Sequence, residues 1–494
     1  MTGRPGAPRE VGPGDLVTEV QTLLDAGHRL LLMACHEDDD RFRVVYSFAV
    51  PGSPPVELVL AVPRQDPWVP TLAAVSYPAG RFEREIRDLY GVRPEGHPLP
   101  HRLLRHAHWP RGWYPMLRDA EVRPRFDLDT GSFPFLEVEG EGVYEIPVGP
   151  VHAGLIEPGH FRFSVVGETI LRMKARLWFL HRGIEKLFEG RRPGDGIELA
   201  ERISGDTAVG HTLAFVTAVE RATGIEVAET DRLVRALLLE MERMHNHVAD
   251  LGALANDVGY GIVNAHAQRL RETLLRLNKT TTGHRLLRGG ISVGGARLVE
   301  LLDPLVVQRV AAEVFELVDI TLGSSVVRDR FAGTAVLRGE QARAMGTLGY
   351  VARASGVDVD ARRDHPSVDL GDRFEVVTEP GGDVMARYLV RAREVAVSAA
   401  LVCDLRERIA GSYGSGAAVD PGLGGAGTGI VEAWRGMLVH RVELGGDGRL
   451  TRVKVVDPSF FNWPALPVAL ADTIVPDFPL ANKSFNQSYA GNDL

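Results

Sequence analysis

The chain has 494 residues, of which 45% are hydrophobic and 24% are charged, and its net charge is −9. This length exceeds one ordinary hydrophobic core, so we expect two domains of a soluble, globular class. The acidic balance and the lack of any run of basic residues argue against a nucleic-acid partner. No window reaches about 18 consecutive apolar residues, so we expect no membrane-spanning segment.

The N-terminal third predicts a small α/β domain. Residues 15–34 have the apolar spacing of a short helix. Two β-branched runs follow at 41–50 and 55–63, separated by PGSP, which is typical of a hairpin. A second helix is expected around FEREIRDLYG, ending at Gly91 as a C-cap. The opening residues lack the apolar core of a signal peptide.

Four histidines are clustered in a proline-rich stretch after this helix, namely His97, His101, His106 and His108. Their spacing is irregular, and no acidic or thiol residue completes a ligand set, so a metal site is disfavoured. We expect the stretch to dock on a neighbouring subunit. Cys35 and Cys403 are too few for a disulfide framework or a four-thiolate site, and we expect both to be buried.

The most informative stretch is 146–211, which contains GPVH, EPGHF, HRGIEKL and RISGDTAVGH in that order. This order resembles the large subunit of the membrane-bound (group 4) [NiFe]-hydrogenases and the quinone-site D subunit of respiratory complex I. Residues 84–119, with GHP and a Trp-rich turn, resemble the complex I C subunit. A fusion of the two modules in this order resembles the formate hydrogenlyase type of large subunit. We therefore expect a C-like domain at 1–120, a linker at 121–145 and a D-like domain at 146–494.

The implied fold class is α+β, with the small N-terminal domain joined to a larger, mainly helical domain that carries peripheral β-hairpins. Residues 228–255 have a clear helical period. Glu240, Arg243 and His247 form one polar line on this helix, which favours a solvated face by pattern, or a cavity wall by resemblance. GLGGAG at 422–427 fits a nucleotide-binding pattern weakly, and we interpret it as a flexible loop before a strand at VEAW.

The family's hydrogenases hold nickel and iron with four cysteine thiolates. The resemblance aligns the first pair with Ser204 and Thr207, and the second pair with Ser488 and Gly491. Neutral hydroxyls cannot supply the charge that such a centre needs. We therefore expect no nickel–iron centre and no metal ligand at these positions.

In the complex I relatives the same cavity receives a quinone through a His, a Tyr and an Asp. Their aligned positions here are Ile156, Gly205 and Asp257, so two of the three contacts are missing. A quinone remains a possible ligand, because an apolar cavity can admit one without these donors.

Three further residues of the aligned cavity can carry protons: His152, Glu157 and His211. Together with Asp257 they are the candidate proton-relay or cavity residues, because buried Glu–His sets titrate near neutral pH. An equally good interpretation is that these residues form structural ion pairs and that the histidines form hydrogen bonds that satisfy the polar groups of their loops.

The resemblance implies the core subunit of a membrane-associated oxidoreductase complex, on the cytoplasmic side of the membrane. Its partners would be a small iron–sulfur subunit and antiporter-like integral membrane subunits, and its cofactor chemistry would depend on the partner's cluster. The alternatives are a quinone-reducing subunit, a formate hydrogenlyase hydrogenase subunit with an atypical site, and a scaffold without chemistry.

Overall fold

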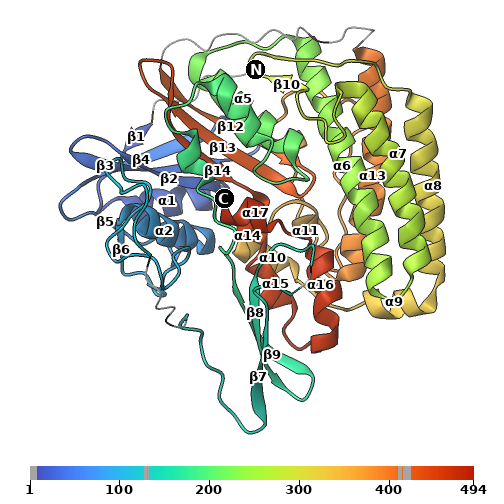
Figure 1. Cartoon of the computed structure of the whole chain (residues 1–494), viewed down its shortest axis with the longest axis horizontal. Coiled ribbons are helices and arrows are strands. Elements are labelled where there is room, and N and C mark those ends of the chain that lie inside the picture. The colour runs from blue at the N-terminus through green and yellow to red at the C-terminus, as the bar shows by residue number, and fades with distance from the viewer. Residues whose placement is uncertain (1–7, 127–130, 132, 153, 410–413, 415–423) are drawn as a thin grey trace.

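The structure is a computed structural model that describes residues 8–126, 131, 133–152, 154–409, 414 and 424–494. A small sheet domain lies on one side of the molecule and a long helical bundle lies on the other, with a three-stranded sheet between them (Figure 1). This mixed α+β architecture confirms the fold class expected from the sequence.

The N-terminal domain is a four-stranded sheet covered by two helices. The strand order is β1-β4-β3-β2, in which β1 is parallel to β4 and the other pairs are antiparallel. Its elements are β1 (Arg9–Glu10), α1 (Leu16–Asp25), β2 (Arg29–Glu37), β3 (Arg41–Ala49), β4 (Val56–Pro63), β5 (Trp68–Pro70), α2 (Tyr77–Tyr90) and β6 (Arg93–Glu95).

Two details of this domain follow from local sequence. Helix α2 begins at the N-cap Ser76 and ends at Gly91, whose φ of 82° is the left-handed conformation that glycine adopts readily. The expected helix over 15–34 is wrong beyond Asp25, because the chain turns at Gly27 and residues from Arg29 form β2. A short apolar run does not distinguish a buried strand from a helix by its pattern alone.

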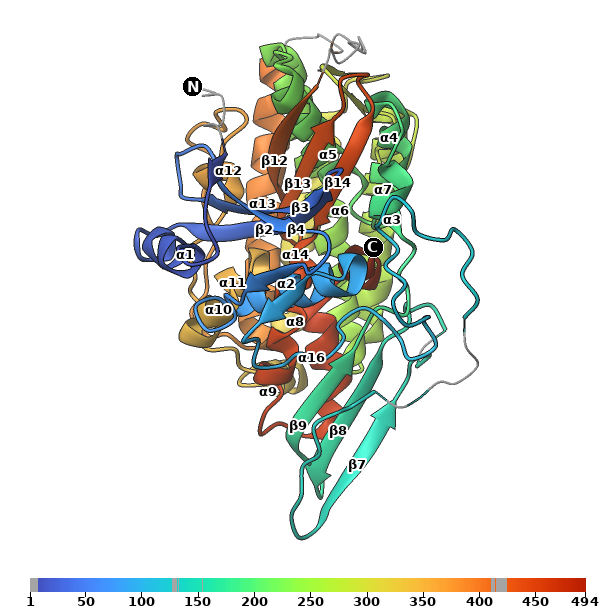
Figure 2. The same cartoon turned by 90° about the vertical axis from the view of Figure 1, so that its left-hand side faces the viewer.

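The remainder of the chain carries one projecting sheet and one central sheet. The projecting sheet is β7 (Val143–Val148), β8 (His160–Val166) and β9 (Thr169–Arg176), which extends away from the body (Figure 2). The central sheet is β12 (Gly425–Ala433), β13 (Gly436–Leu444) and β14 (Leu450–Val456). A two-stranded ribbon is formed by β10 (Ile291–Ser292) and β11 (Gly295–Ala296).

Four long helices form the bundle at the far side: α6 (Glu229–Asp257), α7 (Gly261–Thr282), α8 (Pro304–Gly323) and α13 (Val384–Arg408). Helix α5 (Ala208–Thr223) covers the central sheet. The shorter helices are α3 (Ile184–Phe188), α4 (Pro193–Ala200), α9 (Ser325–Phe331), α10 (Gly339–Met345), α11 (Gly349–Arg353), α12 (Ala361–Asp364), α14 (Pro458–Asn462), α15 (Ala465–Ala469), the 3-10 turn η1 (Val475–Asp477), α16 (Phe478–Phe485) and α17 (Tyr489–Asp493).

The central sheet is buried, with helix α5 packed on one of its sides. Gly425, Gly427 and Gly429 lie on β12, and a Cβ at each would stand 2.0–2.3 Å from a backbone oxygen of α5. The glycines therefore let the helix backbone rest directly on the strand. The expected loop at 422–427 is thus wrong for residues 425–427, while residues 422 and 423 lie outside the described residues.

The other side of the central sheet is held to the N-terminal domain by buried ion pairs. Lys454 of β14 lies 2.8 Å from Glu85 of α2 and 3.0 Å from Glu185 of α3. Arg441 of β13 pairs with Glu57 of β4 at 2.9 Å. In the described residues, no helix is long and apolar enough to cross a membrane.

Candidate functional site

The loop before α5 and the N-terminus of α17 meet at one place, although they are far apart in the sequence. The Ser204 and Ser488 hydroxyl oxygens are 2.8 Å apart and hydrogen-bonded, and both residues are buried. Ser488 is the N-cap of α17 and accepts a hydrogen bond from the Gly491 amide at 2.8 Å. The structure thus brings together residues that the sequence aligns with the two thiolate pairs.

The HRG turn explains why these two segments meet. His181 Nδ1 lies 2.7 Å from the Asp493 carbonyl oxygen, and the Arg182 amide donates to the Leu494 carbonyl at 2.7 Å. The Arg182 guanidinium donates at 2.6 Å to the carbonyl of Ile203, immediately before Ser204. One turn therefore ties α17 to the loop that precedes α5.

The residues at this place do not fit a nickel–iron centre. Ser204 and Ser488 offer neutral hydroxyls that hydrogen-bond to each other, whereas a nickel–iron centre needs charged thiolate donors. Gly491 offers no donor atom, and a Cβ there would lie 2.5 Å from the Asp457 carboxylate. The hydroxyls of Ser204 and Thr207 are neutral and already hydrogen-bonded to Asp206, each at 3.0 Å.

Asp206 and Arg435 form an ion pair next to Ser204 and Thr207. Asp206 accepts two hydrogen bonds from the Arg435 guanidinium, at 2.6 and 2.7 Å. Burial raises the pKa of Asp206, but Arg435 and the two hydroxyls outweigh burial and lower that pKa to about 2. Arg435 also lies over the Trp434 ring at 3.9 Å, and Trp434 Nε1 donates to Thr207 Oγ1 at 3.0 Å. The buried indole therefore packs directly against the hydroxyls.

His211 lies on α5 in a buried chain of polar groups. Its Nε2 is 3.0 Å from Asp457 Oδ2, and its Nδ1 is 3.0 Å from His440 Nε2. Burial raises the pKa of Asp457, but His211, Arg435 and Ser459 together outweigh burial and the net shift is downward. Burial and His211 lower the pKa of His440. His211 is thus held between a carboxylate and a second imidazole.

His152 and Glu157 lie in the β7–β8 loop and both contact α17. His152 Nε2 is 3.4 Å from the Tyr489 hydroxyl, and Glu157 Oε2 accepts from the Ala490 amide at 3.0 Å. The sequence predicts a buried Glu157, but its side chain is exposed. The carboxylate instead accepts a hydrogen bond from one amide, that of Ala490, in the first turn of α17.

Asp257 is separate from this group. It is the last residue of α6, half-buried, about 17 Å along the helix from Asn246, which donates to the Asp206 carbonyl. Burial raises the pKa of Asp257, and Lys483 of α16 opposes the rise. Ile156 and Gly205 are exposed, and Gly205 faces open space. The structure therefore brings His152, Glu157 and His211 around α17 but leaves Asp257 at a distance.

The polar line on α6 is buried, so the solvated-face interpretation is wrong. Glu240, Arg243 and His247 are each at most 2% exposed. Arg243 donates to the carbonyls of Glu432 and Ala433 at 2.7 and 3.1 Å. This line therefore supports the hairpin turn that carries Trp434 and Arg435.

Sequence reasoning missed several residues of the site. Asp493 is buried, and burial raises its pKa to about 6. Four further residues were also not identified as candidates from the sequence: Asp206, Arg435, Asp457 and His440. A signal existed only for Trp434, which departs from the family's EAPRGE pattern at VEAWRGM. The others are common polar residues whose importance depends on contacts distant in sequence.

The histidine stretch after α2 docks within its own chain. His97 Nε2 is 2.9 Å from the Gly80 carbonyl oxygen, and His106 Nε2 is 2.9 Å from the Trp178 carbonyl oxygen. Arg176 of β9 donates to the carbonyls of Leu103, Leu104 and Arg105. Within the described ranges, no group of three or more His, Cys, Asp or Glu residues has a geometry that could hold a metal ion.

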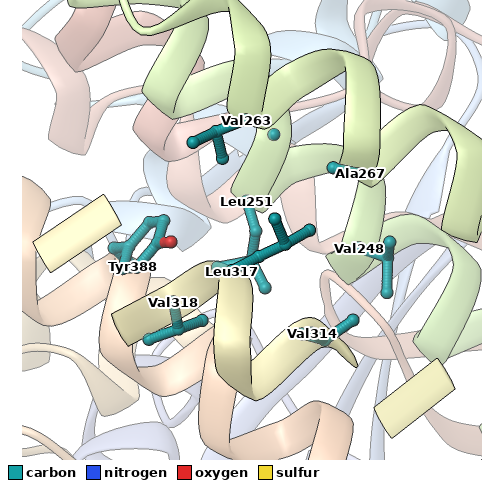
Figure 3. A pocket seen from close by; sticks show the side chains of 9 residues that line it. Val248, Leu251, Val263, Ala267, Val314, Leu317, Val318 and Tyr388 are labelled. Carbon is teal, nitrogen blue, oxygen red and sulfur yellow. The ribbon is translucent and has the colours of Figure 1, made fainter. Parts of the chain in front are cut away.

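Two hollows lie in the bundle, away from these residues. An apolar cavity of about 10 Å³ is enclosed by α6, α7, α8 and α13 (Figure 3), which is about the room of one water molecule. Tyr388 alone among its nine lining residues has a polar side-chain atom, so the cavity offers at most one side-chain group that could orient a ligand. A larger cleft beside Cys403 lies between α8 and α13. Cys403 is half-buried, whereas Cys35 is buried as expected, and both are free.

Comparison with known families matches three parts of the chain. The family of the 30 kDa subunit of respiratory-chain NADH dehydrogenase matches residues 10–125, and that of the 49 kDa subunit matches 257–421. The nickel-dependent hydrogenase family matches residues 182–256.

Individual relatives agree with these matches. Formate hydrogenlyase subunit 5 of Escherichia coli (strain K12) is 34% identical, over 83% of this chain and 74% of the relative. The fused C/D subunit of NADH-quinone oxidoreductase from Phocaeicola vulgatus is 28% identical, over 70% of this chain and 71% of the relative. A chain in the structure of the archaeal membrane-bound sulfane sulfur reductase complex aligns with a TM-score of 0.66 at 25% identity, over 72% of this chain and 99% of that one.

Proposed function

Because the chain belongs to the family of formate hydrogenlyase subunit 5, we propose that it is the core subunit of a membrane-associated hydrogenase- and complex I-like oxidoreductase complex. In this proposal the chain works without a nickel–iron centre of its own. The observation that carries the proposal is the direct Ser204–Ser488 hydrogen bond, beside the Asp206–Arg435 ion pair, where the family's metal ligands align.

The relatives' names are compatible with a site that has changed its chemistry. They refer to formate hydrogenlyase, to NADH-quinone oxidoreductase and to sulfane sulfur reductase. Proteins similar to this chain thus act in complexes named for different substrates. The site of this chain is built from hydroxyls, a guanidinium and a carboxylate, so its own residues would position and protonate a substrate rather than bind a metal.

A small iron–sulfur subunit would be the partner at the surface around the HRG turn. Arg202, whose carbonyl accepts a hydrogen bond from Arg182, lies near His284 together with Arg288 and Glu201. A cluster held by thiolates is an anionic group that such arginines would stabilise. Exposed apolar side chains in the neighbouring loops and in α3 would be covered by the same partner: Val151, Leu155, Ile156, Phe179 and Leu187.

Proton transfer would use the residues around α17. Asp493 has a pKa raised to about 6 by burial, so it changes charge near neutral pH. Glu157 raises this pKa further, which puts the two carboxylates close enough to interact. In the proposal Glu157 exchanges protons with the outside, and Asp493 and His152 receive them.

Membrane attachment would come from antiporter-like and other integral membrane subunits, with this chain peripheral on the cytoplasmic side. Purification of the intact complex followed by metal analysis tests the central point. We expect iron from the partner's cluster and nickel far below one atom per chain. Stoichiometric nickel would contradict the proposal and support an atypical formate hydrogenlyase hydrogenase subunit.

Two alternatives remain distinguishable by experiment. A quinone-reducing subunit would be labelled at this chain by a photoreactive quinone analogue, and excess quinone would prevent the labelling. A scaffold would assemble with its partners but tolerate Glu157→Gln and Asp493→Asn without any change in the turnover of the complex. Loss of turnover with intact assembly excludes the scaffold.

A further inference from the structure

A buried charge cluster lies next to the end of β12 that leads to Trp434, where Arg243 donates to the Glu432 and Ala433 carbonyls. It contains four carboxylates and three guanidiniums, all at most 8% exposed: Glu240, Asp360, Glu394, Glu432, Arg243, Arg353 and Arg362. Arg353 is its centre, because it pairs with both Glu394 and Glu432 at 2.7 Å. With every carboxylate ionised, these groups carry one more negative charge than positive charges.

His247 joins this cluster from α6. Its Nε2 lies 2.7 Å from Glu394 Oε2, so the ring donates its hydrogen from this atom and is oriented by the carboxylate. Its other nitrogen, Nδ1, is buried and has no hydrogen-bond partner among the described residues. An orphaned nitrogen of this kind is costly in a protein interior unless it has a role.

Two aromatic rings lie beside the imidazole. The His247 ring centroid is 6.0 Å from that of Trp434 and 6.1 Å from that of Tyr350, with the ring planes nearly perpendicular. The guanidiniums of Arg435 and Arg391 lie over these two rings, at 3.9 and 3.8 Å from their centroids. His247 thus contacts the same indole that donates a hydrogen bond to the Thr207 hydroxyl.

We propose that His247 binds one proton beside Trp434 and that Glu394 is its positioning residue. Protonation at Nδ1 would add one positive charge and would bring the cluster, taken together with His247, to neutrality. This inference goes beyond the proposed function, since it concerns a proton site that is independent of the partner and of metal content.

The charged groups around His247 come from every element that packs against it. Those on α6 are Glu240, Arg243, His245 and Asp250, and those on α13 are Arg391 and Glu394. The others are Arg353 of α11, Asp360 and Arg362 at the start of α12, Glu432 of β12, and Arg435 in the turn after β12. The outlying pairs Arg391–Asp250 and Arg435–Asp206 are each neutral. Arg29 and Asp364 lie beyond Glu432 at the domain boundary.

His245 is a natural control on the same helix. It is also buried and also has an orphaned Nε2, but its Nδ1 lies near the Met241 carbonyl and the Asn278 amide rather than a carboxylate. Burial lowers the pKa of His245 to about 4. Burial lowers the pKa of His247 as well, but Glu394 opposes that fall.

The test measures both midpoints in the full chain, by hydrogen–deuterium exchange at the imidazole C2 position with the two residues separated by peptide fragmentation. We expect the midpoint of His247 to lie above that of His245. Glu394→Gln should lower the His247 midpoint by about one pH unit or more, and should leave the His245 midpoint unchanged.

A His247 midpoint at or below that of His245 overturns the proposal, as does a midpoint that Glu394→Gln does not move. Because Glu394 also pairs with Arg353, thermal melting must show that the variant is folded. Glu394→Asp is the second variant, because it keeps the charge and should move the His247 midpoint less than Glu394→Gln. The wild-type comparison of the two histidines decides the question even if neither variant folds.

Discussion

Glu157 is an exposed carboxylate placed at the start of α17, beside the buried Asp493. We predict that Glu157→Gln lowers turnover of the complex by tenfold or more, because a glutamine can accept the Ala490 hydrogen bond but cannot transfer a proton. Steady-state assays of the assembled complex measure this effect. The control is Glu168→Gln, an exposed glutamate at the β8–β9 turn, which should leave turnover unchanged. Equal rates in both variants would remove Glu157 from proton transfer.

Glu242 is buried and accepts hydrogen bonds from the Val209 and Gly210 amides at the start of α5, at 2.7 and 3.0 Å. Burial raises its pKa from 4.5 to about 8, so between these values the folded chain binds a proton that the unfolded chain does not. Stability should therefore fall as pH rises from about 4.5 to about 8.

Glu242→Gln removes this titration. We predict that the unfolding free energy of the wild type, minus that of the variant, decreases over the same pH window. Denaturant titrations at several pH values measure the difference. A difference that is constant from pH 5 to 8 would show that Glu242 is ionised in the folded chain.

Much of the site could be found at residue level from the sequence, because its motifs are short and ordered. Ser204 and Ser488 align as counterparts, and they are in hydrogen-bonding contact. Asp493 and Asp457 could not be found, since the raised pKa of one and the His211 contact of the other arise from packing between distant segments. Glu157 lies in the loop that its motif predicts, but its exposure depends on how that loop lies against α17.

At the scale of elements, the backbones of β12 and α5 pack directly against each other. A Cβ at Gly427 would stand 2.3 Å from the Ala218 oxygen, so Gly427→Ala must push the helix away from the strand. We predict a loss of about 1–3 kcal/mol, measured as a lowered thermal midpoint. Gly446→Ala is the matched control, because nothing lies within 4 Å of the position that its Cβ would take and its φ is not left-handed. Equal midpoints in the two variants would contradict the close packing.

Helix α6 could be predicted from the sequence almost to its ends. Helix α2 could be predicted at its C-terminal end only, because it begins at Tyr77, before the expected segment FEREIRDLYG. Elements without a one-sided hydrophobic pattern could not be predicted in this way. Strand β2 is buried along nearly its whole length, so it lacks the alternation that marks a half-exposed strand. Strand β12 begins with a glycine-rich run that local propensity assigns to a loop, and only the approach of α5 explains it.

At the scale of the whole molecule, the two domains share a buried ionic interface. Lys454 neutralises Glu85, whereas Glu185 is also paired with Arg452 at 2.7 Å. We predict that Lys454→Met destabilises the chain by roughly 3–5 kcal/mol, because Glu85 is left buried without its partner. The double variant with Glu85→Leu should recover most of this loss.

Thermal unfolding followed in both halves of the chain measures this prediction. The two halves should unfold together in the wild type and at a common, lower temperature in Lys454→Met. A variant as stable as the wild type would show that the interface charges are dispensable.

The hydroxyl pair between Ser204 and Ser488 has a practical consequence for the whole protein. Thiolates at such a place would be open to oxidation, whereas serine and threonine side chains resist it. The contact between the two ends of this site should therefore persist under oxidising conditions that would convert thiolates to sulfenic or sulfinic acids.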